Sequence, residues 1–538
     1  MKTIQKALCA LSVTVLFFSC SKEYDRGNLI PKRAIGVMAI NTPKIVDEIK
    51  WDVLFGSDLL KFKSFEKNEM MKKVMANPMG TGIGFAEKSY FFVDSAASLE
   101  NVVAAAIIPL SDGGEFSEFV KANVDAKNQS KKIGELEIKK LDDKLFLAWN
   151  EHTLFTIANK GSEKEVADYI TALYAAKESS LLTTEFKGKE VFTGDAHIAM
   201  YMNYSTILSS MKEQLAKSGM KMDFGAQISY AGVVNFKNGL MDVVVDCYSD
   251  GKLMDMTKFI TDPNIQSVAS TMDASNSLAF FGASFSWKAL PEALAKMGTK
   301  PMIDGVMMNM GISLDTLCSS LGNDIAFSFD GMQAKQVTEA VEVYGDDYMA
   351  PPTIEMQTRT VKSPMMKAGM SLNDTAYIKG LLRKFLGRSI LPGTADVFQM
   401  PFGGGYLFFK DKLVMFSSDS LSYVAMANGT VKFDNAVLKD KAVAVYANTK
   451  DLQKKMALDP SGADGISANE YNTTGIFQKY FSTFAIESAK PTVEHSQITF
   501  NFNMVNKEEN FIISVLKFAK EIETQLMPKA MPEATPGA

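Results

Sequence analysis

The sequence is poor in the side chains that most often carry enzyme chemistry. Its 538 residues include only three histidines and four cysteines. Histidine is the usual acid or base near neutral pH, and His152, His197 and His495 have no cysteine or carboxylate at metal-ligand spacing. We therefore expect all three to be solvated or half-buried, and we expect no catalytic residue, cofactor or metal.

An excess of charge of one sign is also missing. The chain has 57 Lys and Arg against 62 Asp and Glu, a net charge of −5. Loss of the first nineteen residues would remove Lys2 and Lys6 and change this to −7. Nucleic-acid binders usually show a basic face or domain, so we expect no nucleic-acid partner.

Long apolar runs are confined to the N-terminus. MKTIQKALCALSVTVLFFS, residues 1–19, has two lysines and then a short apolar run, which is typical of a secretory signal. No later apolar run reaches the roughly 20 residues that a spanning helix needs. With 46% hydrophobic residues, the remaining chain can bury more than one core.

The signal ends at Phe17-Phe18-Ser19-Cys20, which resembles the lipobox of bacterial lipoproteins, although Phe17 replaces the preferred leucine. The resemblance implies that Cys20 carries a diacylglyceryl group and an N-linked acyl chain such as palmitate. Stable anchoring needs more than one chain, and this modification supplies it. The alternative is an ordinary signal peptide cut nearby, with Cys20 an incidental thiol.

The residues after Cys20 bear on localisation. Ser21 resembles the signal for outer-membrane delivery, and Lys22-Glu23-Tyr24-Asp25 is weakly similar to surface-export tags. We expect a protein anchored by lipid in the outer membrane and facing the periplasm or the surface. Such a compartment would permit a disulfide between Cys247 and Cys318, but their strand-like and helix-like surroundings favour two buried free thiols.

Two distant segments have similar sequences. Asp195–Met211 reads DAHIAMYMNYSTILSSM and Asp440–Met456 reads DKAVAVYANTKDLQKKM. In both, an apolar strand pattern containing Tyr201 or Tyr446 ends at an asparagine. Asparagine is a good helix N-cap, so we expect Asn203 and Asn448 to begin helices.

Other segments match in the same order. A strand–helix pattern occurs at 34–50, with Asn41 or Thr42 as cap, and at 278–296, with serine caps; the remaining pairs are the capped helices 112–121 and 373–382, the hairpins 146–158 and 406–418, and the hairpins 227–245 and 497–515. Five matched pairs predict an internal duplication.

The predicted fold is α+β, with two similar tandem copies, each a mainly antiparallel sheet with packed helices. The expected organisation is signal 1–19, lipidated tether 20–33, repeat domain one 34–255, repeat domain two 277–525 and disordered tail 526–538. The polar stretch 251–276 is the expected joint. Insertions near 333–360 and 457–490 should lie outside the shared core.

Short motifs add no chemistry. Ser64–Lys67 fits S-x-x-K without its partner motifs, and Asp459–Glu470 fails the calcium-loop register. Gly80–Gly84 lacks dinucleotide-loop spacing, and Gly403–Gly405 suggests a turn or a close backbone approach. The methionines near 302–310 suit an irregular core or an adaptable binding surface better than a copper site.

The lipobox, followed by the strand–helix start AIGVMAIN, resembles large bacterial lipoproteins of a domain-of-unknown-function family. This resemblance implies no activity. We expect a non-catalytic binding or scaffolding module of the cell envelope, with an envelope protein or glycan as its partner. The alternative is a periplasmic or surface hydrolase with a carboxylate active site.

Overall fold

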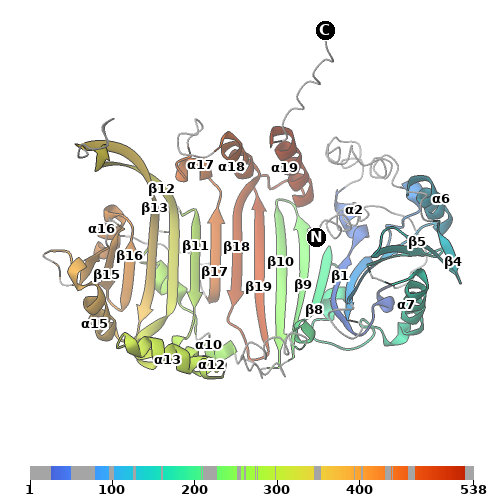
Figure 1. Cartoon of the computed structure of the whole chain (residues 1–538), viewed down its shortest axis with the longest axis horizontal. Helices are drawn as coiled ribbons and strands as arrows, with labels where there is room; N and C mark the ends of the chain where they lie inside the picture. Colours follow the sequence, from blue (N-terminus) through green and yellow to red (C-terminus); the bar gives the residue numbers. More distant parts are fainter. Residues whose placement is uncertain are drawn as a thin grey trace, which may run out of the picture. The chain divides into compact units, whose positions relative to one another are not determined.

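The chain forms two compact units, which we call unit one (Met1–Asp255 with Thr492–Ala538) and unit two (Met256–Pro491). The computed structural model describes residues 26–49, 79–95, 102–124, 129–158, 161–207, 209, 227–250, 256–259, 262–272, 274, 277–296, 298–343, 353–392, 394, 396–400, 404–430, 438, 440–458 and 467–526. Each unit is an antiparallel sheet with packed helices (Figure 1). The predicted α+β class is confirmed.

The sheet of unit one has the strand order β4-β5-β6-β7-β3-β2-β1-β8-β9-β10-β19, and every neighbouring pair is antiparallel. Its strands are β1 Ala34–Ile40, β2 Ser89–Ser95, β3 Val102–Pro109, β4 Lys131–Ile133, β5 Leu136–Lys140, β6 Leu145–Trp149, β7 Thr153–Ala158, β8 Ile198–Asn203, β9 Ile228–Lys237, β10 Leu240–Ser249 and β19 His495–Met504. The expected hairpin at 146–158 is β6–β7.

The helices of unit one begin where polar caps interrupt the strands. Asp112 caps α6, and Ser162 with Glu165 forms a capping box on α7. Asn41 accepts the Lys44 N–H at 3.4 Å at the start of α2. The α-helices are α2 Thr42–Ile49, α6 Gly113–Asn123, α7 Glu163–Ala175, α8 Glu190–Thr193 and α19 Phe511–Leu526, and the 3₁₀ turns are η1 Arg26–Leu29, η3 Met79–Thr81 and η5 Lys177–Ser179.

The two faces of the unit one sheet are covered by different helices. On one, the α7 face, Val37, Phe92 and Tyr201 pack with Val166 and Ile170 of α7. Side chains alternate along a strand, so their neighbours point to the opposite face, which we call the α2 face. There α6 contributes one apolar cluster, and α2 with α19 contributes another.

The sheet of unit two has the strand order β14-β15-β16-β13-β12-β11-β17-β18, again antiparallel throughout. Its strands are β11 Ala279–Ser284, β12 Leu321–Val343, β13 Thr353–Leu372, β14 Val397–Gln399, β15 Tyr406–Lys410, β16 Leu413–Ser417, β17 Lys441–Asn448 and β18 Phe481–Ala489. The expected hairpin at 406–418 is β15–β16.

Helices at the start of unit two supply part of its core. Ile265, Val268 and Ala269 of α11 are fully buried against Phe280 and Met415, so this part of the polar stretch 251–276 belongs to the packed core. The α-helices are α10 Met256–Phe259, α11 Ile265–Ala269, α12 Leu290–Lys296, α13 Lys300–Asn309, α14 Leu314–Ser320, α15 Thr375–Leu386, α16 Ser420–Asn428, α17 Leu452–Lys455 and α18 Ala468–Tyr480, and the 3₁₀ turns are η6 Trp287–Ala289 and η7 Gly387–Ser389.

The two expected insertions differ in outcome. The outer part of the β12–β13 ribbon, beyond Gly331, pairs only with itself and extends past its neighbours (Figure 1). This agrees with the expectation for 333–360. Residues 481–489, however, form β18 and pair with β17, so that part of 457–490 enters the sheet and the expectation is wrong there.

Two local predictions near the ends of strands are also wrong. The expected hairpin at 497–515 is β19 followed by helix α19, because the Asn510 side chain accepts the Ile512 N–H and Ile513 packs against α2. Asn448 accepts the Lys450 N–H at 2.9 Å and so closes a turn, and does not begin a helix. The Thr449 N–H donates to the Ser482 carbonyl of β18, so the extended backbone continues past Asn448. The helix α17 begins only at Leu452.

Asn203 behaves as predicted. Its side chain accepts the Thr206 N–H at 3.3 Å at the start of a helical turn. Tyr201 is buried and Tyr446 is half-buried, each within its strand.

Candidate functional site

A cavity with a volume of about 790 Å³ lies on the α2 face of unit one. Two adjacent rows of cross-strand neighbours form its floor. One row is Leu145, Ala158, Ala104, Val93, Gly36, Met202 and Tyr230, and the other is Thr156, Ala106, Phe91, Met38, Met200, Gly232 and Val245. The cavity therefore follows the sheet across eight strands, from β6 to β10.

The lining is almost entirely apolar. It contains no charged side chain, and Thr156 and Tyr230 are the residues on the floor that carry a hydroxyl. Burial raises the pKa of the Tyr230 phenol, so it stays a neutral group. A site of this kind holds an uncharged apolar group and offers no acid, base or nucleophile to it.

Small residues create the space. Gly36, Ala104, Ala106, Ala158 and Gly232 leave the floor low between the larger side chains. Three methionines, Met38, Met200 and Met202, border them. Methionine is unbranched and adapts to irregular shapes, so the floor can adjust to an occupant.

Helices close one long side of the cavity. Met38 and Phe91 belong both to its lining and to the margin of the cluster formed by Ile40, Ile45 and Ile513. Ala106 also contacts the cluster beneath α6. The clusters beneath α2 and α6 thus border the cavity along this side.

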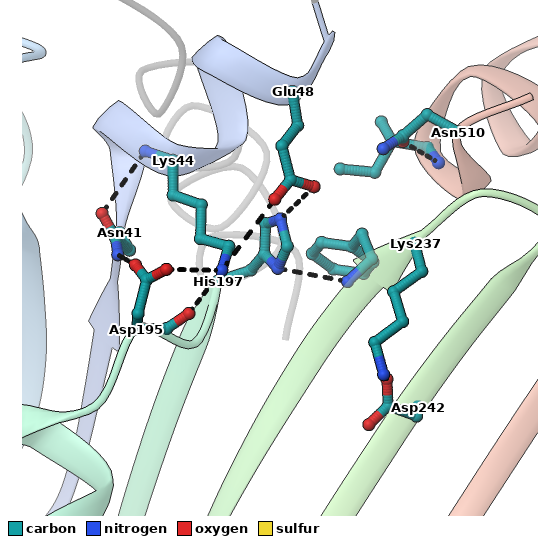
Figure 2. Close-up of polar contacts among 10 residues, drawn as sticks. Asn41, Lys44, Glu48, Asp195, His197, Lys237, Asp242 and Asn510 are labelled. Atoms are coloured by element: carbon teal, nitrogen blue, oxygen red, sulfur yellow. Dashed lines mark hydrogen bonds and ion pairs between the residues drawn. The ribbon is translucent and has the colours of Figure 1, made fainter.

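A polar cluster holds α2 in place beside the cavity (Figure 2). Lys44 donates to Asp195 at 2.8 Å, and Asn41 donates to the same carboxylate at 3.3 Å. One turn later, Glu48 contacts His197 at 2.9 Å. These contacts connect α2 to the segment that leads into β8.

His197 has no free ring nitrogen. Its Nδ1 accepts the Phe236 N–H at 3.2 Å, so the proton lies on Nε2, which donates to Glu48. The side chain is buried, and both nitrogens are engaged within the protein. His197 is therefore buried with both ring nitrogens engaged, whereas the sequence suggested a solvated or half-buried side chain.

The other histidines lie outside the cavity. His495 contacts Asp246 at 2.7 Å, where Gln497 also donates to the carboxylate. His152 is exposed in the β6–β7 turn. The described residues contain no group of three or more His, Cys, Asp or Glu side chains that could hold a metal ion.

Buried carboxylates also have partners within the protein. Asp94 is fully buried and accepts from Arg33 and from the Tyr169 hydroxyl. Asp324 is also buried and accepts from Ser284 at 2.8 Å, and the half-buried Asp330 pairs with Lys367 at 2.7 Å. None of them lines the cavity.

Cys247 in β10 and Cys318 in α14 are free thiols. Burial raises the pKa of both, which disfavours the reactive thiolate. Both thiols are free as expected, but only Cys318 is buried, and Cys247 is half-buried. Cys20 lies outside the described residues.

The structure describes several residues of the remaining sequence motifs. Glu470 forms a capping box with Ser467 at the start of α18. Gly405 has a φ of 119°, and a Cβ there would collide with the Ser417 carbonyl, which explains the glycine. Met302 and Met308 are exposed on α13. Ser64–Lys67 lies outside the described residues.

Comparison with known proteins finds no matching family model, no matching curated protein and no matching solved structure. Within the described parts of the chain, no helix has the length and apolar character needed to span a bilayer.

Sequence reasoning missed the cavity. Its only signal was the unusual number of small residues inside strands, as in the run V-V-A-A-A of β3. Which of them share a face and a row depends on strand order and register, which the chain does not display locally.

Proposed function

We propose that the protein is a lipoprotein of the cell envelope, anchored at Cys20 in the outer membrane, that binds an apolar ligand without chemical conversion. The cavity on the α2 face carries this proposal, because about 790 Å³ of uncharged space suits a ligand. The engaged nitrogens of His197 and the paired buried carboxylates supply no reactive group there.

The anchor is tested by labelling. Cells producing the wild type, Cys20→Ala or Cys9→Ala are grown with radiolabelled palmitate, and the purified protein is counted. Cys9 lies within the expected signal, so Cys9→Ala is the matched control. Label should enter the wild type and the control but not Cys20→Ala. Equal labelling of all three would remove the anchor from the proposal.

Binding is tested with the Cys20→Ala chain, which carries no lipid and is otherwise complete. We expect N-phenyl-1-naphthylamine, an apolar fluorophore, to bind saturably with increased fluorescence. Ala104→Met should weaken binding, because Ala104 is an exposed residue of the cavity floor. Ala122→Met places the same side chain on exposed α6 and should have no effect. Absence of saturable binding would refute the proposal.

We further propose that the two units descend from one duplicated ancestor. The strand orders β5-β6-β7-β3-β2-β1-β8-β9 and β14-β15-β16-β13-β12-β11-β17-β18 support it. Once β4 is left out, strands of the same rank along the chain occupy the same positions in the two sheets. This correspondence of strand positions extends over eight strands in each unit.

The register gives independent support. When Tyr201 and Tyr446 are treated as equivalent, their cross-strand partners define further equivalent pairs: Val37 and Phe280, Phe92 and Ser328, Ala105 and Lys367, Ile157 and Ser417, and Phe146 and Tyr406. The last pair also begins the two hairpins that the sequence aligns. Counting from Phe92 and Ser328, Asp94 matches Asp330, so each unit has an acid there.

An experimental structure of the full chain tests the duplication. Superposition of the two strand sets by backbone position alone should bring Tyr201 onto Tyr446 and Asp94 onto Asp330. A best fit displaced by an odd number of residues would reverse the sheet faces and would contradict common descent.

A further inference from the structure

The cavity of unit one is long and narrow. Its floor crosses eight strands, and neighbouring strands lie about 4.8 Å apart, so its contour along the sheet is about 34 Å. Its width is set by two side-chain rows on one face, which are about 7 Å apart along each strand. The hydrocarbon tail of one bilayer leaflet is about 15 Å deep, so one tail fits lengthwise.

The volume agrees with one chain. Dividing the cavity volume of about 790 Å³ by the contour gives a mean cross-section of about 23 Å². Carbon atoms in contact lie about 4 Å apart, so an extended polymethylene chain occupies a cross-section of about 16 Å². Two chains side by side would need about 32 Å², more than the mean cross-section of the cavity.

The chemistry of the lining fits the same occupant. A chain of methylene groups makes no hydrogen bond, and the cavity has no charged side chain that its burial would leave unpaired. The hydroxyls of Thr156 and Tyr230 lie toward opposite ends of the floor, on β7 and β9. The long middle section, from Ala104 to Gly232, presents only apolar side chains.

Unit two carries larger side chains at some of the same sheet positions. The register pairs place larger side chains of unit two at three positions where unit one is small: Met366 for Ala104, Phe416 for Thr156 and Ile486 for Gly232. An antiparallel sheet of this order therefore accommodates bulk at these three positions. At two others, where unit one has Met202 and Met200, unit two has the smaller Ala447 and Val445.

We propose that the cavity on the α2 face of unit one binds a single-chain lipid, with its alkyl tail lying along the sheet from β6 to β10. The proposal rests on the binding function proposed above and names its ligand class. The affinity comes from transferring the tail out of water, and each buried methylene should tighten binding about fourfold.

Displacement of cis-parinaric acid, a linear fluorescent fatty acid, tests the proposal in the Cys20→Ala chain. Saturated fatty acids of increasing length compete for the site, each kept below its aggregation threshold. We expect binding to tighten about fourfold per methylene and to level off once the tail fills the cavity. A two-chain phosphatidylglycerol presented in vesicles should not compete.

Two variants copy residues of unit two into the cavity of unit one. Ala104→Met and Thr156→Phe each install the larger residue found at the matching position, and each should weaken palmitate binding at least about tenfold, since the added atoms displace two or more methylenes. Ala122→Met on α6 should bind like the parent. Thermal unfolding of each variant checks that the fold is retained. If one of the two cavity-filling variants does not fold, the other still tests the proposal.

The outcomes separate the two proposals. If fatty acids bind with the chain-length dependence and both fillings weaken them, the inference stands. If N-phenyl-1-naphthylamine binds and responds to Ala104→Met but fatty acids do not compete, the single-chain lipid is wrong and the binding function survives. Competition by phosphatidylglycerol equal to that of palmitate would also overturn the single-chain lipid proposal. If neither probe binds, both proposals fail.

Discussion

The buried carboxylate of Asp94 is expected to stabilise unit one strongly. It is fully buried at the end of β2 and accepts from Arg33 Nε at 2.8 Å and Nη2 at 3.0 Å. The Tyr169 hydroxyl of α7 donates to it at 2.9 Å. These bonds connect three segments that are far apart in the sequence, so Asp94→Asn tests a tertiary interaction while preserving side-chain shape.

The magnitude follows from exposure. Removing one partner of a fully buried ion pair costs about 3–5 kcal/mol. The Arg33 side chain is 56% exposed, so water can solvate its guanidinium after the exchange, and we reduce the expected loss to about 2–3 kcal/mol. Tyr169→Phe removes one hydrogen bond to a charged acceptor and should cost about 1.5–2 kcal/mol.

Tyr174→Phe is the matched control. Tyr174 lies on the same helix, and its oxygen accepts from the neutral Asn150 amide at 3.0 Å, so its loss should cost about 1 kcal/mol or less. Urea unfolding of the full chain, followed by circular dichroism, gives the change in unfolding free energy. Since the chain has two units, the shift should appear in one transition if two are resolved.

The double variant tests whether the two exchanges act on the same contact. Asp94→Asn with Tyr169→Phe should cost less than the sum of the single exchanges by about 1 kcal/mol, because both disrupt the same contact. An Asp94→Asn variant within about 0.5 kcal/mol of the parent, or a Tyr169→Phe loss no larger than that of Tyr174→Phe, would refute a stabilising charged network.

Three further predictions address other sites. Asn203→Ala should lower the unfolding free energy by about 1 kcal/mol through the lost cap, whereas Asn448→Ala should cost visibly less because Asn448 closes only a turn; equal losses in urea would contradict the assignment. Burial, followed by the hydrogen bond to Glu487, raises the pKa of Tyr446. The resulting stability is present below the ordinary phenol pKa of about 10 and is lost as pH rises, so Tyr446→Phe should flatten the alkaline decline in unfolding midpoint; an unchanged decline would exclude Tyr446 as its source. Gly405→Ala should destabilise by about 1–3 kcal/mol because of its positive φ and the Ser417 carbonyl, while Gly380→Ala in α15, where a Cβ meets nothing within 4 Å, should be neutral or stabilising in thermal unfolding.

Local patterns in the sequence predicted local structure well. Continuous apolar runs ending at a capping residue identified β1 with α2 and β8 with Asn203, and paired runs around a polar turn identified β6–β7 and β15–β16. These features depend on neighbours within a few residues. The same logic failed at 511–515, where apolar residues with mixed spacing suggested a strand, because the contact between Ile513 and α2 is not visible in the sequence.

The candidate site was beyond such reasoning for the same physical cause. Ala104, Thr156 and Gly232 come from three segments, and only the register of the strands between them places them on one floor. The bond between Glu48 and His197 likewise joins residues that no local pattern relates. The absence of a catalytic constellation is an expectation that activity assays would test.

The last strand of the chain has a consequence for biogenesis. β19 pairs along β10 from Leu240–Asn503 to Tyr248–His495, so the sheet of unit one keeps an open edge until nearly the whole polypeptide is available. If the chain is exported from its N-terminus, β10 can pair with β9 but its other edge stays open while unit two emerges. Exposed strand edges invite association with other chains. Such long-range pairing is slow to form. A periplasmic chaperone that shields β10, or a pause before β19 emerges, would therefore affect the yield of unit one more than that of unit two, and truncation before His495 should damage the part of the protein made first.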